Sequence, residues 1–210
     1  MHFLHFKILF LTMSITLVIS SSNCSNSSDV QVMQYALGIQ AYSSLFYSSM
    51  ALNESFFSSA PNSSNTNYSI NVQRMGQQNY RGAFLVDSIG SNITGFQSPN
   101  CSFKIPKLAN ATDFLDAALY IETSLTGAFL GLSGYTQTAE ISELINWLAV
   151  QHGMHSTYIT AFSQPIVFPQ NGTSSVPILP PDYVLGTKDE PFMLGQFLGT
   201  CVAAPKGPCI

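Results

Sequence analysis

The chain has 210 residues, of which 46% are hydrophobic and only 9% are charged, and its formal net charge is −4. Seven basic residues scattered over this length form no patch that could neutralise a phosphate backbone, so the sequence excludes a nucleic-acid partner. The length favours one domain with a substantial core. Because charges are few, neutral polar side chains must cover the surface, which is more typical of a secreted glycoprotein than of a cytosolic enzyme.

Residues 1–22 have the layout of a secretory signal peptide. Lys7 precedes an apolar run that ends in the small residues Ser20 to Ser22. A signal anchor is the alternative, but this run is short for a membrane span, which needs about 20 residues. We therefore expect a secreted protein, extracellular or in the cell wall, with no stable membrane insertion after the leader is removed.

Potential glycosylation sites support secretion, since the sequence contains nine Asn-x-Ser/Thr sequons without proline in the middle. These sequons are at Asn23, Asn26, Asn53, Asn62, Asn67, Asn92, Asn100, Asn110 and Asn171.

The four cysteines, Cys24, Cys101, Cys201 and Cys209, are expected to form two disulfides in an oxidising compartment. None of them has the C-x-x-C spacing of a zinc or redox site. Three pairings are conceivable. We favour Cys24 or Cys101 bonded to Cys201, which would staple the C-terminal tail to the helical body.

Two helical segments follow the leader. The first is expected over 30–52, after an N-cap supplied by Ser27-Ser28-Asp29, and a loop rich in Ser and Asn follows it. The second ends before Gly90. The connection from about 91 to 110 contains prolines and is long for neighbouring antiparallel helices, so it predicts a second and third helix that run parallel.

A third helix, capped by Thr112, is apolar nearly all round and is therefore expected in the centre of the fold. A fourth helix begins near Glu140 and Glu143. Residues 165–210 contain eight prolines and cannot form one long helix. They are expected to form an extended arm with a short helix over 192–201.

Three titratable side chains lie on the apolar faces of these last two helices. Glu122 is on the stripe of the third helix, and His152 and His155 are on the stripe of the fourth. Burying a bare carboxylate costs several kcal/mol, so Glu122 must be protonated, paired or metal-bound.

The runs ALYIETSLTGAFLGL and LAVQHGMHSTYI, followed by a Pro-rich arm that ends in EPFMLGQFLGTC, resemble the secreted ferritin-like domain family. This family includes fungal stress proteins of the Rds1 type and plant desiccation-related proteins. The resemblance covers the chain from about Val30 to Cys201. It implies an all-α, ferritin-like four-helix bundle over 23–164, with a long crossover between helices 2 and 3 and the Pro-rich arm of 165–210 packed on the bundle.

Ferritin-like di-iron proteins place a Glu on each of two helices and a Glu-x-x-His pair on each of the other two. Laid on that pattern, the sequence keeps Glu122 and the second histidine of the fourth helix. Gln40, Gln78 and Arg81 occupy positions where the pattern has carboxylate or histidine ligands. Arginine brings a fixed positive charge and no lone pair, so the set is a degenerate one that cannot hold two irons.

Three hypotheses follow. In the first, Arg81 pairs with Glu122 in place of metal, the histidines hydrogen-bond with Gln40, Gln78 or tyrosines, and the protein is a non-enzymatic scaffold without a cofactor in a cell-surface, cell-wall or stress-related role. In the second, Glu122, His152 and His155 form a mononuclear site for one Fe or Zn ion, in a metal-binding protein or an oxidoreductase.

In the third hypothesis, the chain is an extracellular binding module whose interface with a protein or cell-wall partner lies on the arm at 192–201. No residue is assigned a catalytic role, because the sequence has no G-x-S-x-G elbow and no Gly-rich phosphate loop.

Overall fold

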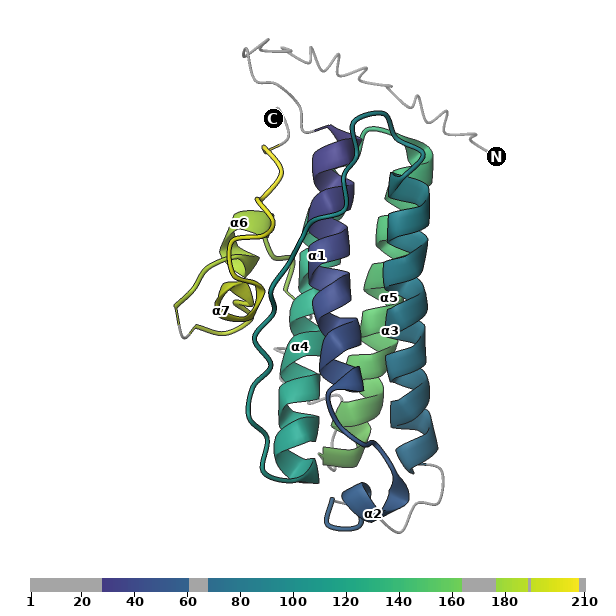
Figure 1. Ribbon diagram of the computed structural model, residues 1–210, viewed down its shortest axis with the longest axis vertical. Coiled ribbons are helices and arrows are strands. Elements are labelled where there is room, and N and C mark those ends of the chain that lie inside the picture. The colour runs from purple at the N-terminus through teal and green to yellow at the C-terminus, as the bar shows by residue number, and fades with distance from the viewer. Residues whose placement is uncertain (1–27, 61–67, 164–176, 189, 208–210) are drawn as a thin grey trace, which may run out of the picture.

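The computed structural model describes residues 28–60, 68–163, 177–188 and 190–207, and within them the chain is helical (Figure 1). Four long helices form a bundle, and the short helix α2 lies at one end of it. The long helices are α1 (Asp29–Ser48), α3 (Tyr68–Gly90), α4 (Ala111–Leu132) and α5 (Ala139–Ser163). The short elements are α2 (Glu54–Phe57), the 3-10 turn η1 (Ser133–Tyr135), α6 (Pro181–Val184) and α7 (Gly195–Leu198).

The connection between α3 and α4 runs along the whole length of the bundle (Figure 1). As a result α3 and α4 point in the same direction, while α1 and α5 point in the other. The predicted long crossover and the predicted parallel pair of helices are confirmed. α1 packs mainly against α3, and α4 packs mainly against α5.

The first helix ends at Ser48, four residues earlier than predicted. The Ser48 hydroxyl donates to the Leu45 carbonyl at 2.9 Å, and the Ser49 hydroxyl donates to the Phe46 carbonyl at 2.7 Å. Serine side chains that bond nearby carbonyls compete with the helical backbone, so they favour the end of a helix. The chain then turns into α2, which the sequence did not predict.

Two helices have an asparagine as N-cap. The Asn110 Oδ1 accepts from the Asp113 backbone N–H at 2.9 Å, so Asn110 caps α4, and the prediction that Thr112 does so is wrong. The Asn53 Oδ1 accepts from the Phe56 N–H at 2.9 Å and caps α2 in the same way. Asn110 and Asn53 are both sequon residues, and their caps use the oxygen of the side chain rather than Nδ2.

The four sequon asparagines within the described residues, Asn53, Asn92, Asn100 and Asn110, are all exposed. The other five sequons lie outside the described residues. Within the described parts of the chain, no helix combines the length and apolar character of a membrane span.

The core is rich in aromatic side chains. Tyr35, Tyr42, Phe46, Phe114 and Phe129 are fully buried, and full burial of one such side chain is worth about 1.5–3 kcal/mol. The rings of Phe46 and Phe114 stack with centroids 5.0 Å apart and hold α1 against α4. These contacts fix the two helices that carry Gln40 and Glu122.

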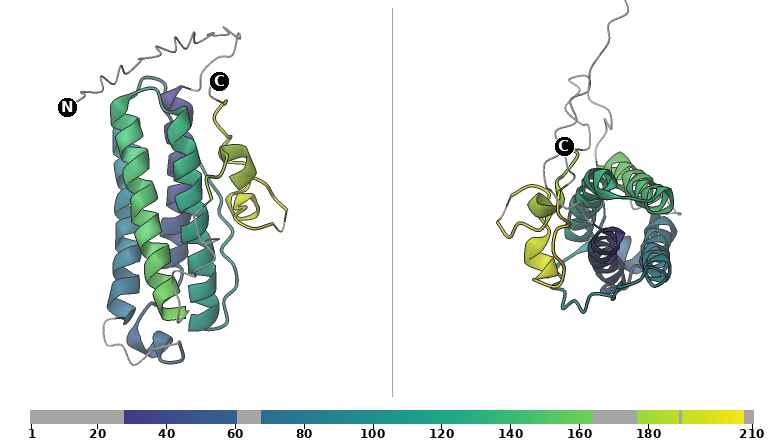
Figure 2. Two further views of the ribbon diagram at one scale, coloured as in Figure 1. Left: turned by 180° about the vertical axis from the view of Figure 1, so that it is seen from behind. Right: turned by 90° about the horizontal axis from the view of Figure 1, so that it is seen from above.

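The arm packs beside α1 and α4, on the side of the bundle where the crossover also runs (Figure 2). A disulfide between Cys101 of the crossover and Cys201 of the arm joins the two segments, which confirms one of the two favoured pairings. Cys24 and Cys209 lie outside the described residues. Gly127 and Gly131 of α4 leave room for the arm, and the Leu179 N–H donates to the Gly127 carbonyl at 3.0 Å.

The predicted short helix over 192–201 is too long, because α7 covers Gly195–Leu198 alone. Phe192 and Gly199 both have positive φ, at 69° and 65°, which interrupts the helix on either side. A second short helix in the arm, α6, was not predicted. Its first residue is Pro181, where the fixed φ of proline suits a helix start.

Candidate metal centre

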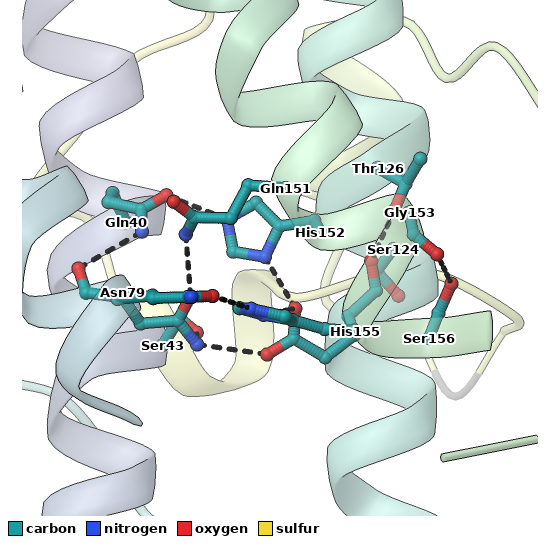
Figure 3. A network of polar contacts seen from close by, with 12 residues as sticks. Gln40, Ser43, Asn79, Ser124, Thr126, Gln151, His152, Gly153, His155 and Ser156 are labelled. Atoms are coloured by element: carbon teal, nitrogen blue, oxygen red, sulfur yellow. Dashed lines mark hydrogen bonds and ion pairs between the residues drawn. The ribbon is translucent and has the colours of Figure 1, made fainter. Parts of the chain in front are cut away.

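Near the middle of the four long helices, polar side chains converge inside an otherwise apolar core (Figure 3). Every long helix contributes at least one buried polar side chain to this cluster. These side chains are Gln40 and Ser43 on α1, Asn79 on α3, Glu122 on α4, and Gln151, His152 and His155 on α5.

Glu122 is the hub of this cluster. Its Oε2 lies 2.5 Å from His152 Nδ1 and 3.2 Å from His155 Nδ1, and its Oε1 accepts from Asn79 Nδ2 at 2.9 Å. Burial alone would raise the pKa of Glu122, but the two imidazoles outweigh it and hold the pKa well below the usual range. The carboxylate is therefore ionised inside the bundle.

The other ring nitrogen of each histidine meets an amide oxygen. His152 Nε2 lies 2.8 Å from Gln40 Oε1, and His155 Nε2 lies 2.7 Å from Gln78 Oε1. The side-chain amide of Gln40 cannot be flipped, because its Nε2 donates to the backbone carbonyl of Asn79 at 3.1 Å. We therefore assign the Nε2 proton to His152, and by the same contact to His155.

With Nε2 protonated, each Nδ1 directed at Glu122 carries either a lone pair or a second proton. A lone pair facing a carboxylate is repulsive, so the space between the two Nδ1 atoms and Oε2 calls for positive charge. Protons on Nδ1 can supply it, and so can a metal ion. In metal sites, a ligating histidine usually donates its other N–H to a carbonyl or carboxylate, as both histidines do here.

Three further contacts hold the cluster in place. Asn79 Nδ2 donates to Ser43 Oγ at 2.8 Å, and Gln151 Nε2 donates to Asn79 Oδ1 at 3.1 Å. Gly82 leaves the space that Gln40 fills, since a Cβ at this position would lie 2.7 Å from Gln40 Nε2. The orientation of His152 thus depends on a glycine of α3.

The structure brings together most of the residues predicted for this site. Glu122, His152 and His155 meet, and Gln40 and Gln78 contact the histidines as the first hypothesis predicted.

The predicted pairing of Arg81 with Glu122 is wrong. Arg81 is exposed on the outside of α3, whereas Glu122 is fully buried and takes its hydrogen bonds from other residues. Asn79 occupies the inward position, and at about 100° per residue Arg81 points some 200° away from it.

Sequence reasoning also missed Ser43, Asn79, Gln151 and Tyr47. A signal was present for Ser43, because it is a polar residue three positions from Gln40 and shares its helix face. Asn79 and Gln151 each stand one position from a predicted member of the site and are turned about 100° from it, so the pattern did not single them out. Nothing in the sequence distinguished Tyr47 from the other core aromatics.

The donor set does not fit two irons. Such a centre needs carboxylates that bridge the ions, and Glu122 is the single carboxylate among the described residues of the cluster. One ion does fit, because one nitrogen or oxygen from each of Glu122, His152 and His155 lies within 4.8 Å of the others. Two histidines and one carboxylate suit Fe(II) and are also acceptable to Zn(II).

A buried tyrosine hydroxyl lies beside the same carboxylate. Tyr47 is 3% exposed, and its Oη makes no hydrogen bond of regular geometry in the described structure. Burial raises the pKa of Tyr47 well above its usual value, and the negative charge and acceptor oxygens of Glu122 raise it further. Tyr47 therefore belongs to the surroundings of the carboxylate.

A family model described as a ferritin-like domain matches residues 28–165. This range contains all four long helices and every member of the buried cluster. No curated protein matches the sequence.

Proposed function

Because the chain belongs to the ferritin-like domain family, we propose that it is a secreted glycoprotein whose buried centre binds one divalent transition-metal ion, iron or zinc, instead of two irons. The observation that carries this proposal is the convergence of both histidine Nδ1 atoms on Glu122 Oε2, with both Nε2 atoms held by amide oxygens. His152, His155 and Glu122 would hold the ion.

Each neighbouring residue has a definite part in this proposal. Gln40 and Gln78 orient the two imidazoles through their Nε2 protons, so that both Nδ1 atoms are available as ligands. Asn79 holds the second oxygen of Glu122 and thereby fixes the carboxylate plane. A bound ion would supply Lewis acidity and, if it is iron, one-electron redox chemistry.

The charges of the three ligands also suit an ion. Two neutral imidazoles and one carboxylate would leave a divalent ion with a net charge of +1 at the centre. Because a histidine nitrogen must be deprotonated to act as a ligand, any proton on Nδ1 would be released when the ion binds.

The proposal that the protein is secreted and glycosylated is supported by the leader, by the nine sequons and by the exposure of Asn53, Asn92, Asn100 and Asn110. A eukaryotic secretory pathway would attach sugar to such exposed side chains. Cell-surface, cell-wall and stress-related roles remain the expectation from the resemblance.

A second candidate function is a metal-free scaffold, and one observation favours it. The buried cluster closes on itself, since Asn79 links Ser43, Glu122 and Gln151 without any ion. In this case the histidines and Glu122 form a buried ion-pair network that fixes the packing of four helices, and the protein has no catalytic activity.

Metal analysis of the mature protein, purified from a secretory host, separates the two candidates. The metal-binding proposal predicts one equivalent of Fe or Zn, lost in His152→Ala and retained in the control Asn146→Ala, an exposed position on the same helix. It also predicts a lower melting temperature in chelator. A protein that stays metal-free after incubation with Fe(II) or Zn(II), and whose melting temperature is the same in chelator, would establish the scaffold instead.

A further inference from the structure

One face of the bundle carries an unusual concentration of exposed apolar side chains. Tyr80 and Phe84 on α3, and Trp147, Val150 and Met154 on α5, are each between 48% and 68% exposed. We call this surface the α3–α5 face. A monomeric soluble protein rarely leaves such a group of large apolar side chains in contact with water.

These side chains form one connected surface. Trp147, Val150 and Met154 line a pocket of about 350 Å³ together with Arg81 of α3. Arg81 also lines the groove between α1 and α3, where Tyr80 is one of the walls, so Tyr80 lies at the α1 edge of this surface. Arg81 therefore joins the apolar residues of the two helices, and it lies beside Trp147, whose ring can stack with a guanidinium.

The described connections between the helices lie away from this face. The crossover and the arm lie on the side of α1 and α4 (Figure 2). None of the nine sequons falls within α3 (Tyr68–Gly90) or α5 (Ala139–Ser163), so sugar attached at any of them starts outside both helices.

The hydrogen bond from Gln151 to the side chain of Asn79, at 3.1 Å, fixes the register of the two antiparallel helices. Because α3 and α5 run in opposite directions, the residue after Asn79 on α3 is level with the residue before Gln151 on α5. Tyr80 therefore lies at the same height as Val150. This height is also the middle of the apolar group.

The charges on the face are unequally distributed about that middle. Glu143 is seven residues from Val150, roughly 10 Å towards the end where α5 begins, and Glu140 lies beyond it. Arg74 is six residues from Tyr80, roughly 9 Å towards the opposite end. The face thus has an acidic end and a basic end at similar distances from an apolar centre.

We propose that the α3–α5 face binds a second copy of this chain, in an antiparallel pair with twofold symmetry whose axis passes near Val150. In this arrangement the acidic end of each copy lies over the Arg74 end of the other, and the apolar centres cover each other. A parallel pair would instead place Glu140 and Glu143 at the acidic end of the partner, where like charges repel. A surface that is complementary to itself is what a twofold pair requires.

Sedimentation analysis of the mature protein over a range of concentrations tests the pairing. We expect a monomer–dimer equilibrium that persists in chelator, and at least about tenfold weaker dimerisation in Val150→Arg. The matched control is Ile178→Arg, since Ile178 is 72% exposed but lies on the arm, and it should dimerise like the wild type. A wild-type protein that stays monomeric at every concentration, or a dimer unaffected by Val150→Arg, overturns the proposal.

Disulfide trapping tests the orientation. Because an antiparallel twofold axis near Val150 brings this position next to itself, Val150→Cys should give a covalent dimer under mild oxidation, whereas Ile178→Cys should not. A parallel pair would set Val150 opposite Tyr80 of the partner subunit and give no such product. A dimer that Val150→Cys fails to trap therefore overturns the antiparallel arrangement. Because the dimer is expected with and without metal, neither result depends on whether the buried centre binds an ion.

Discussion

Glu122→Gln is the substitution that tests the buried cluster most directly. Glutamine has nearly the same shape, but one carboxylate oxygen becomes an NH2 donor. If this NH2 faces Asn79, it meets the amide Nδ2 that now donates to Oε1 at 2.9 Å. If it faces the histidines instead, it takes the place of the oxygen that now lies 2.5 and 3.2 Å from the two Nδ1 atoms. The single amide oxygen cannot both accept from Asn79 and face the two histidines, as the two carboxylate oxygens do.

The expected loss in the free energy of unfolding is about 3–5 kcal/mol, the range for breaking a buried ion pair by removing one partner. The measurement is urea unfolding of the metal-free protein at neutral pH with its disulfides intact. Glu143→Gln is the matched control, because Glu143 is exposed on α5, and its effect should stay within about 0.5 kcal/mol. A loss below about 1 kcal/mol in Glu122→Gln would refute the reasoning that the carboxylate is ionised and paired.

The stability difference between wild type and Glu122→Gln is expected to depend on pH. The pKa of Glu122 is lowered in the folded protein, so its charged form is stabilised by folding. This contribution is complete above the unfolded-state value, about 4.3 for Glu, and is lost as the pH falls below it. The stability difference between wild type and Glu122→Gln should therefore shrink in acid, and a difference that grows there would contradict the assignment.

Three other substitutions test the surroundings of the centre. Gly131→Ala places a Cβ 1.9 Å from the Leu179 carbonyl oxygen, so the arm must shift; we expect a loss of about 1–3 kcal/mol and faster proteolysis of the arm. Cys101→Ser opens the bond to Cys201, which spans 100 residues, and should cost about 2–5 kcal/mol in unfolding experiments. Tyr47→Phe removes a buried hydroxyl without a partner, so metal-free protein should change by less than about 1 kcal/mol. A larger loss there would mean that Tyr47 bonds to Glu122 in solution.

The sequence was sufficient to predict the architecture because the signals for it are strong. Helix periodicity identified four helices, and the length of the connection between 91 and 110 required the second and third to run parallel. The apolar stripes around Glu122 and His152 predicted that these side chains meet inside the bundle. Secondary structure and apolar patterning are local properties, so a single sequence expresses them well.

The rotation of α3 about its own axis could not be predicted. Gln77, Gln78, Asn79 and Arg81 are all polar, so the pattern does not show which of them points inward. The structure answers this through tertiary packing, since Gly82 sits against Gln40 and thereby turns Asn79 towards Glu122. The prediction that Arg81 supplies positive charge in place of a metal ion is wrong for this reason alone.

The dual role of two sequon asparagines affects how glycosylation must be mapped. Asn53 and Asn110 accept the N-cap hydrogen bonds of α2 and α4 through Oδ1, while sugar would be attached at Nδ2. Replacing either asparagine removes both a helix cap worth about 1 kcal/mol and the glycan. A secretion defect in such a variant therefore cannot be assigned to one of the two losses. Ser55→Ala and Thr112→Ala abolish the acceptor sequence at exposed positions and leave both caps in place. With these variants, the effect of the sugar can be measured apart from the folding of the helix that it decorates.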